Sequence, residues 1–234
     1  MINNLIINSA IVDDIDFIID TIIESDKSST NVISACNIFS ISEEEYRSVL
    51  KQILLEDFPN SEYSLSGFLV ARVDGEKVGA LCSWVENADG ISNAIIKSSL
   101  LMSFIEKEKL VSTGRKLEII NGMSFERKPN SIQIEYGYVI APRRRKKIFT
   151  QLILSSLKKH VNFEVGVTSA ETVLFEKNIN SFDAFTKLQF KVKNKKTFEE
   201  KDVFNIFPYD TKVLMNIDLE NKHDYFEKFN YLLQ

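Results

Sequence analysis

Tyr138-Val-Ile-Ala-Pro-Arg-Arg-Arg-Lys-Lys-Ile-Phe-Thr-Gln-Leu-Ile153 is the stretch that decides the fold. It begins as the end of an apolar run from Ser131 to Ile140 that predicts a strand. Pro142 ends this strand because proline cannot donate a ladder hydrogen bond. The cations Arg143 to Lys147 follow, and then a helical pattern from Phe149 to His160. The sequence therefore predicts a strand that leads through a cationic turn directly into an amphipathic helix.

The cationic turn and the helix after it form a pattern that binds anions. The first turn of any helix presents backbone N–H groups without internal acceptors, at the positive end of the helix dipole, and the two together hold phosphate. Arg143 to Lys147 raise the local potential further. Two alternatives stay open for these cations. They form either a solvated loop or a nucleic-acid patch, although no stacking aromatic residues alternate with them.

The rest of the chain alternates between helical and strand-like patterns. Before the opening stretch, the spacing predicts helices over 10–25 and 42–54 with a loop over 26–40 between them, and strands over 67–73 and 76–85 around the hairpin signal Asp74-Gly75. A helix over 91–110 and an ambiguous segment over 117–127 follow. After the helix that ends at His160, it predicts a strand over 163–169, a helix over 178–188, strands over 190–198 and 212–219, and an amphipathic tail. Strands alternate with helices only in the second half. We therefore expect an α/β (α+β mixed) fold with one mixed sheet and helices on both faces.

Domain organisation follows from what the sequence lacks. We find no internal repeat, low-complexity tract or linker, so one domain over 1–234 is the economical interpretation. The helical segment at about 91–116 and the tail at about 220–234 are additions to it. The helix near 91–110 either packs on its own domain, walls a pocket or forms a contact in a homodimer.

Composition excludes several classes of function. The 234 residues are 44% hydrophobic, and 29 Lys and Arg against 33 Asp and Glu give a net charge of −4, so we expect no general attraction to nucleic acid or anionic membrane. The N-terminus lacks the features of a secretory signal, and no apolar run approaches the roughly 18 residues of a membrane span. We expect a cytoplasmic protein. Its only cysteines and histidines are Cys36, Cys82, His160 and His223, whose spacing suits no metal.

The opening stretch resembles the acyl-CoA signature of the GNAT acetyltransferases. That signature reads Arg or Gln, two residues, Gly, one residue, and Gly or Ala. The Val-x-x-Pro end at 139–142 and the spacing from Arg145 to Ile148 and Thr150 are similar to it. Ile148 and Thr150 stand where glycine is usual, and glycine there lets backbone approach a pyrophosphate closely. The N–H donors are retained at both positions, since every residue but proline has one.

A second segment, from Asn178 to Phe190, resembles the next motif of the same family. That motif reads Asn, two residues, Ala or Ser, three residues, Tyr, two residues, Leu-Gly-Phe. The agreeing positions are Asn178, Ser181, Leu188 and Phe190. Phe185 replaces the family's Tyr, and Gln189 replaces its Gly. An ordinary amphipathic helix is the alternative, but it does not explain the offset of Asn178. The resemblance covers most of 7–219.

The resemblance implies a mostly antiparallel sheet whose fourth strand splays from the fifth in a V, with acetyl-CoA or another acyl-CoA between them as co-substrate and no metal. The residues that it assigns to this ligand are Tyr138, Val139 and Ile140 along the pantetheine, Arg145, Lys146, Lys147, Ile148, Phe149 and Thr150 at the pyrophosphate, Asn178 near the pantetheine, and Phe185 at the position of the usual Tyr. In the family this Tyr gives a proton to the leaving thiolate, which Phe185 cannot do.

Two residues of the predicted fourth strand are candidates for catalysis. Amines are mostly protonated at neutral pH, so their acylation benefits from a general base. Glu135 is our first candidate for this base, and Glu86, at the end of the preceding hairpin, is the second. The alternative is that Glu135 faces outward from the strand and has no catalytic role. Strand alternation puts Glu135 and Tyr136 on opposite faces, so we expect only one of them to point inward. Tyr138 is a candidate acid in place of Phe185.

The function implied is an N-acyltransferase, specifically one that transfers acetyl from acetyl-CoA to a primary amine by direct attack in a ternary complex. The acceptor would be a small-molecule or peptide amine, lying over the first two helices and 26–40. The alternative is a CoA-binding sensor or a degenerate partner domain without catalytic activity, which the loss of the Tyr at Phe185 keeps open.

Overall fold

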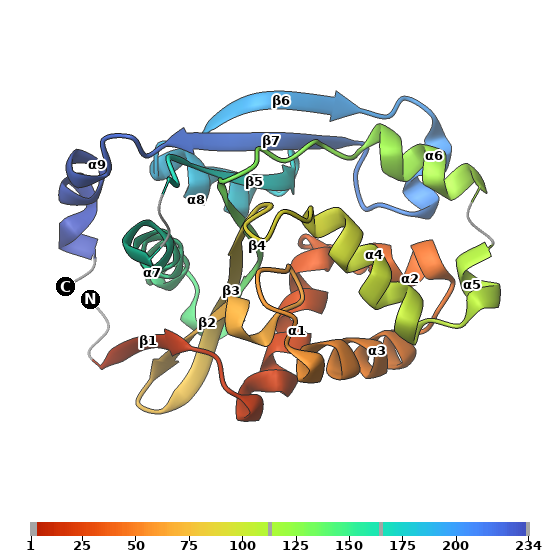
Figure 1. The fold of residues 1–234 in the computed structure, drawn as a ribbon, viewed down its shortest axis with the longest axis horizontal. Helices are drawn as coiled ribbons and strands as arrows, with labels where there is room; N and C mark the ends of the chain where they lie inside the picture. The colour runs from red at the N-terminus through yellow and green to blue at the C-terminus, as the bar shows by residue number, and fades with distance from the viewer. Residues whose placement is uncertain (1–3, 112–113, 164–165, 233–234) are drawn as a thin grey trace.

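The computed structural model describes residues 4–111, 114–163 and 166–232. These residues form a 7-stranded sheet in the order β1-β2-β3-β4-β5-β7-β6 (Figure 1). Its strands are β1 (Leu5–Ser9), β2 (Phe68–Val73), β3 (Glu76–Val85), β4 (Ile132–Val139), β5 (Ser169–Phe175), β6 (Lys191–Thr197) and β7 (Thr211–Asp218). Neighbouring strands are antiparallel except β4 and β5, which are parallel. The predicted mixed, mostly antiparallel sheet is confirmed.

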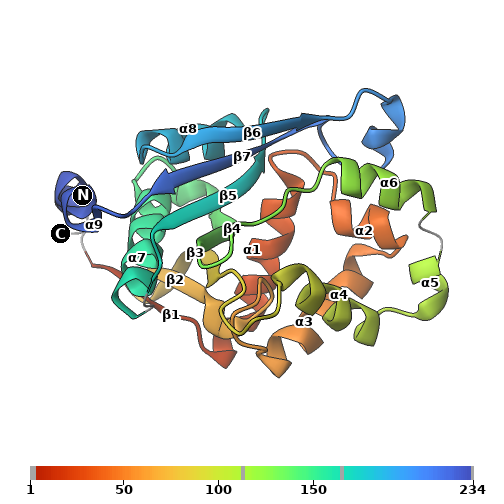
Figure 2. The same ribbon diagram turned by 45° about the horizontal axis from the view of Figure 1, so that its top comes forward.

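Helices cover both faces of the sheet, as predicted (Figures 1 and 2). The α-helices are α1 (Ile15–Lys27), α2 (Ser34–Phe39), α3 (Glu43–Glu56), α4 (Asn93–Phe104), α5 (Lys107–Val111), α6 (Gly114–Gly122), α7 (Ile148–Phe163), α8 (Ile179–Lys187) and α9 (Lys222–Phe229). On one face, here called the α1 face, α1, α3 and α4 share a core with β2 and β3. On the opposite α7 face, α7, α8 and α9 share a second core with β2 to β5 and β7.

Local sequence signals explain the elements that were predicted well. Asp74 and Gly75 join β2 to β3 with φ of 51° and 85°, the left-handed values that a tight hairpin needs. Ser42 caps α3: its Oγ accepts from the Glu45 N–H at 3.1 Å, and the Glu45 carboxylate accepts from the Ser42 N–H at 2.8 Å. This reciprocal capping fixes where α3 begins.

The strand predicted over 163–169 is wrong. α7 continues to Phe163, and β5 begins only at Ser169. The cause is the polar content of β5, whose Glu171 is buried yet fully partnered. Its carboxylate accepts from the Lys128 N–H at 3.0 Å and from the Lys193 ammonium at 3.0 Å. Burial patterns read from sequence assume that carboxylates face water, and Glu171 does not.

Four smaller differences lie elsewhere in the fold. β1 was not predicted, because its apolar run is too short to separate from the helix that follows. The segment 26–40 contains α2, the predicted helix over 91–110 divides into α4 and α5, and the ambiguous 117–127 begins within α6 and ends as a loop.

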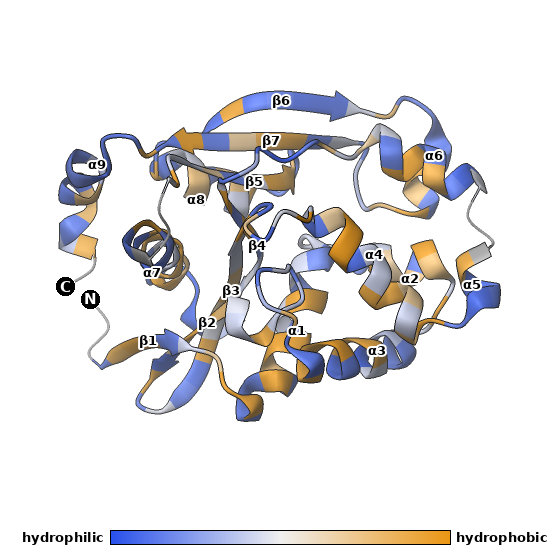
Figure 3. Ribbon diagram, viewed as in Figure 1, coloured by the Kyte–Doolittle hydropathy of each residue, from blue (hydrophilic) through white to orange (hydrophobic). Residues whose placement is uncertain are grey.

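The edge strand β6 is largely hydrophilic (Figure 3). Lysines on an edge strand discourage pairing with another chain.

The feature that positions the site is the divergence of β4 from β5. The two strands pair only at Ile132 with Ala170 and at Gln133 with Glu171. Beyond these pairs, the β4 edge from Ile134 to Val139 has no strand partner on that side among the described residues. A parallel pair that opens toward its carboxyl ends leaves backbone groups free for a ligand, so the predicted V-shaped splay is confirmed.

No helix among the described residues is both long and apolar enough to cross a membrane.

Candidate functional site

The cationic turn follows the open end of the splay and leads into the N-terminus of α7. Within the described residues, no acceptor is found for the backbone N–H groups of Ile148, Phe149 and Thr150 in the first turn of this helix. Arg145 and Lys147 have φ of 61° and 64°, in the left-handed region. Unpaired backbone N–H groups at a helix N-terminus bind anions. The turn therefore brings free N–H donors to the mouth of the splay.

The two positions where the family usually has glycine are ordinary helical positions in this chain. Ile148 and Thr150 both lie in the helix, so neither position needs the backbone freedom of glycine. The side chain of Ile148 is buried in the core of the α7 face. The left-handed backbone falls instead on Arg145 and Lys147, at a cost of about 1 kcal/mol for each non-glycine residue.

The cations of the turn divide into engaged and free side chains. Arg143 forms an exposed ion pair with Glu76 at 3.5 Å, and Lys147 lies 5.5 Å from the ring centre of Tyr231. The Arg144 Nε donates to the Val139 carbonyl at 3.0 Å, and its guanidinium lies 5.6 Å from the ring centre of Tyr138. Arg145 and Lys146 are exposed, and neither has a partner among the described residues. These two are the cations most available to an incoming anion.

β4 carries a bulge halfway along the splay. Glu135 lies opposite Cys82 and Tyr138 opposite Ala80, so Leu81 alone faces two residues of β4, and Tyr136 has a φ of 45°. A bulge interrupts strict alternation. Cys82 and Tyr136 belong to the same core cluster, and a residue shares the face of its cross-strand partner. Glu135 and Tyr136 therefore lie together on the α1 face, and the prediction that they face opposite ways is wrong.

Glycine at 137 admits an aromatic ring under the bulge. A Cβ on Gly137 would collide with the Phe149 ring and would lie 2.6 Å from Cδ1 of Leu81. Phe149 in turn packs edge-on against Phe185 at 6.0 Å, and Phe185 packs against Phe190 at 5.1 Å. Phe185 thus lies buried in an aromatic stack on the α7 side of the bulge and offers no hydroxyl there.

Glu135 points inward and bridges the splay. Its Oε1 accepts from Arg127 at 2.5 Å and from the Val173 N–H on β5 at 3.3 Å, and its side chain is 18% exposed. Burial raises the pKa of Glu135 above its ordinary value, although the Arg127 guanidinium opposes that shift. A partly buried carboxylate with a raised pKa, at the point where β4 and β5 part, is a candidate proton acceptor.

A second group of polar residues, which the sequence did not reveal, lies beside Glu135. The Tyr136 hydroxyl donates to Glu62 at 2.7 Å, and the Lys97 ammonium forms an ion pair with the same carboxylate. Tyr63 stacks on Tyr136 with ring centres 5.7 Å apart. Burial opposes the charge on both ions, but their mutual attraction prevails, so the pKa of Lys97 is raised and that of Glu62 is lowered.

Sequence signals for these residues are weak. Lys97 interrupts an apolar helix, Arg127 ends an ambiguous segment, and Glu62 lies in a loop. Each is an isolated charge with no motif around it. Only the fold brings them together, because α4 and the segment after α6 both cross the α1 face in front of β4.

The remaining predicted residues have distinct positions. Glu86 is buried, and its two carboxylate oxygens accept from the Trp84 indole at 3.1 Å and from the Asn93 N–H at 2.9 Å. It therefore anchors the start of α4, with both oxygens occupied. Asn178 directly precedes α8, and its N–H donates to the carbonyl of Phe175, the last residue of β5. Ile140 donates its N–H to the Val78 carbonyl at 3.0 Å, which ends the pairing of β4 with β3.

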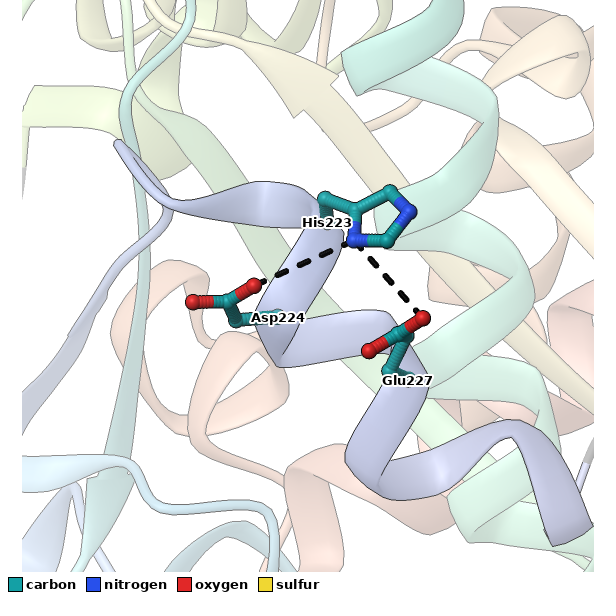
Figure 4. A group of neighbouring side chains, drawn as sticks. All are labelled: His223, Asp224 and Glu227. Carbon is teal, nitrogen blue, oxygen red and sulfur yellow. Dashed lines mark ion pairs between the residues drawn. The ribbon is translucent and has the colours of Figure 1, made fainter.

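One group of potential metal ligands lies apart from the splay. On α9, His223, Asp224 and Glu227 bring their ligand atoms within 4.8 Å of one another (Figure 4). The His223 Nδ1 lies 3.9 Å from Asp224 and 3.8 Å from Glu227. The spacing of the histidines and cysteines in the sequence does not indicate this group, because two of its three members are carboxylates. All three side chains are exposed, as charged residues on a surface helix usually are.

Comparison with solved structures relates the splay to a known fold. An N-acetyltransferase from Staphylococcus aureus Mu50 has a TM-score of 0.62 at 14% identity, over 91% of this chain and 100% of that one. A second acetyltransferase has a TM-score of 0.61 at 19% identity, over 92% of this chain and 100% of that one. The fold is that of the GNAT acetyltransferases. An aminoglycoside acetyltransferase in complex with coenzyme A shares this GNAT fold at a TM-score of 0.51 and 12% identity. The match covers 96% of this chain and 98% of that one.

No protein-family model matches the chain, and no curated protein matches it. Between β3 and β4, α4 and α5 lie within the segment over about 91–116 that the sequence suggested as an addition, and the tail helix α9 lies within 220–234.

Proposed function

We propose that the chain is an acyl-CoA-dependent N-acyltransferase that transfers an acetyl group from acetyl-CoA to a primary amine in a ternary complex. The observation that carries this proposal is the splay of β4 from β5 after two residue pairs, with the donor-rich turn of α7 at its mouth. The GNAT fold supports acyl transfer, while the acetyl group, the amine and the residue roles are our inference.

The residues along the splay fit a pantetheine arm and a pyrophosphate. Because Ile140 donates to Val78, the alternation along β4 turns the N–H and C=O of Val139 toward the splay. Arg144 now occupies that carbonyl, so an incoming amide would exchange with it. The free cations Arg145 and Lys146, with the unpartnered amides from Ile148 to Thr150, suit a diphosphate. We assign Asn178, at the end of β5, to the pantetheine on the opposite side.

Glu135 is our proposed general base. The bound acyl-CoA supplies an electrophilic thioester carbonyl, and the acceptor amine must lose a proton to attack it. Glu135 lies on the α1 face at the splay, and burial raises its pKa toward the range in which a carboxylate removes protons efficiently. Arg127 holds the carboxylate in place. The amine would approach over the α1 face, where Tyr136, Glu62 and Lys97 form a polar wall.

Proton supply to the leaving thiolate falls to Tyr138 in this proposal. It is the β4 residue with a hydroxyl nearest to the open end of the splay, and its ring packs under Arg144. Phe185 has no proton to give, and its aromatic neighbours leave the α7 side of the bulge apolar. The same observation favours a second candidate function, a protein that binds CoA without turning it over.

Two measurements on the purified chain decide between these candidates. Calorimetric titration with CoA tests binding, and mass-resolved transfer from acetyl-CoA to a panel of primary amines tests catalysis. We expect binding together with transfer to at least one amine. CoA binding without transfer to any amine supports the non-catalytic alternative, and absence of CoA binding contradicts both.

A further inference from the structure

The α1 face contains one ammonium group that its neighbours do not neutralise. Lys212, at the start of β7, places its Nζ 4.1 Å from the ring centre of Phe207 and 4.9 Å from that of Phe175. No ion pair or hydrogen bond joins this ammonium to any described residue. Two cations near Glu135 differ in this respect, since Lys97 contacts Glu62 and Arg127 contacts Glu135.

The fold places Lys212 beside the proposed base. Phe175 is its cross-strand partner on β5, and Val173, whose N–H binds Glu135, lies two residues earlier on the same face of the same strand. From the strand rise and spacing, the Cα atoms of Lys212 and Val173 are about 8 Å apart. A lysine side chain spans most of this distance, so from its place over the two rings the ammonium can turn toward an acceptor held beside Glu135.

The nearest carboxylates do not satisfy Lys212. Asp26, at the end of α1, acts on it most strongly through space but makes its own hydrogen bond with the Ala35 N–H at 3.1 Å. Glu135 acts on it next and is bound by Arg127. Burial lowers the pKa of Lys212 to about 8, which reflects a charge that lacks adequate compensation. Buried or half-buried charges are normally paired, so an ammonium in this state calls for an anionic partner.

We infer that Lys212 binds an anionic group of the acceptor, so that the substrate is a primary amine that also carries a carboxylate. This inference rests on the proposed function and specifies its substrate class. A single negative charge suits the site, because Asp26 and Glu135 would repel a dianion such as a phosphate. The rings of Phe175 and Phe207 attract the ammonium itself, but they offer it no oxygen or nitrogen acceptor, so its N–H donors lack a polar partner.

Matched pairs of amines test this inference. The pairs are glycine and glycinamide, β-alanine and β-alaninamide, and 4-aminobutanoate and 4-aminobutanamide, with 2-aminoethylphosphonate as a dianionic comparison. Acetyl transfer from acetyl-CoA is followed by mass spectrometry for the wild type, Lys212→Met and the control Lys158→Met, which changes an exposed lysine of α7. We expect at least one carboxylate to exceed its amide by about 10- to 100-fold in kcat/KM, mostly through KM.

The variants determine whether Lys212 is responsible. Lys212→Met is expected to bring this preference to about 2-fold or less, whereas Lys158→Met is expected to keep it. Transfer with no carboxylate preference in any pair, a preference that survives in Lys212→Met, or a larger preference for the phosphonate overturns the inference while the acyltransferase proposal stands.

A binding measurement separates failure of the inference from failure of the proposed function. N-acetylglycine, N-acetyl-β-alanine and N-acetyl-4-aminobutanoate are titrated into the CoA-loaded protein, together with the corresponding amides, and no turnover is required. If no amine is acetylated but an acid binds the wild type and not Lys212→Met, the subsite stands and the catalytic proposal fails. If the acids bind no better than the amides, or bind both proteins equally, the subsite is overturned.

Discussion

Glu135 on β4 accepts a hydrogen bond from the backbone N–H of Val173 on β5 at 3.3 Å, across the gap where the two strands part. A side chain thus replaces the backbone partner that β4 no longer supplies. The same oxygen accepts from Arg127 at 2.5 Å. In the proposed function, this arrangement holds the carboxylate that acts as the general base.

Glu135→Gln is expected to lower acetyl transfer by about 10²- to 10⁴-fold, the usual contribution of a general base. The amide is isosteric and keeps an acceptor for Val173, so the affinity for CoA is expected to stay within about 3-fold of the wild type. Steady-state rates check the loss of transfer, and CoA titration checks the unchanged affinity. Equal transfer rates in the two proteins would remove Glu135 from the mechanism.

The pH dependence of kcat/KM gives an independent test of the same residue. A base works only when ionised, so the rate falls as the pH drops through its pKa. An ordinary glutamate has a pKa of about 4.3. Because burial raises the pKa of Glu135, the acidic limb is expected at a higher pH than that. The limb should disappear in Glu135→Gln. An unchanged limb in the variant would assign it to another group.

Arg145→Glu is expected to weaken CoA binding by about 10- to 100-fold, because it replaces a charge-assisted phosphate contact with repulsion. Lys158→Glu is the matched control. It makes the same change of charge on an exposed residue of α7, about three turns from the cationic turn. Calorimetry compares the two. An equal loss in both variants would indicate a general electrostatic effect, and no loss in Arg145→Glu would contradict the pyrophosphate assignment.

Gly137→Ala is expected to destabilise the fold by about 1–3 kcal/mol, because the new methyl group would overlap the Phe149 ring. Gly114→Ala is the control, since a Cβ there meets no atom within 4 Å. Urea denaturation measures both. Shortening the ring in Gly137→Ala/Phe149→Leu should recover part of the loss. Gly137→Ala with wild-type stability would show that the ring does not depend on this glycine.

His160 predicts a second pH dependence, this time of stability. Its Nε2 lies 2.9 Å from the Ser83 hydroxyl, and burial lowers its pKa from 6.5 to about 4. As the pH falls from 6.5 to 4, the unfolded chain gains a proton that the folded chain does not, so the free energy of unfolding declines by roughly 3 kcal/mol. The free energy of unfolding of His160→Gln, measured by denaturation across this pH window, should lack that decline. An equal decline in the variant and the wild type would contradict the assignment to His160.

Much of the fold was predictable because its signals are local. The turn Asp74-Gly75, the capping box of Ser42 and the order of the two family-like motifs each depend on neighbouring residues, and the elements that they predict are present. β5 was misplaced because its polar residues are neutralised by partners far along the chain, as Lys193 neutralises Glu171. No local pattern encodes such pairs.

The site was predictable only in part, for the same reason. The sequence proposed the cationic turn and Glu135 as candidates. The bulge at Tyr136 changes which side chains share a face, and a bulge leaves no mark in the alternation of β4. Lys97, Arg127 and Lys212 come from three separate segments and meet only in the folded chain. Their charges in the sequence are indistinguishable from those of surface residues.

Hydrogen exchange with and without CoA tests most directly whether the ligand occupies the splay. We expect the amide of Val139, which faces the splay, and those from Arg145 to Thr150 to gain about 10-fold or greater protection, while the β2–β3 hairpin is unchanged. Protection that appears elsewhere, or no protection at saturating CoA, would contradict the account that the opening between β4 and β5 is the acyl-CoA site.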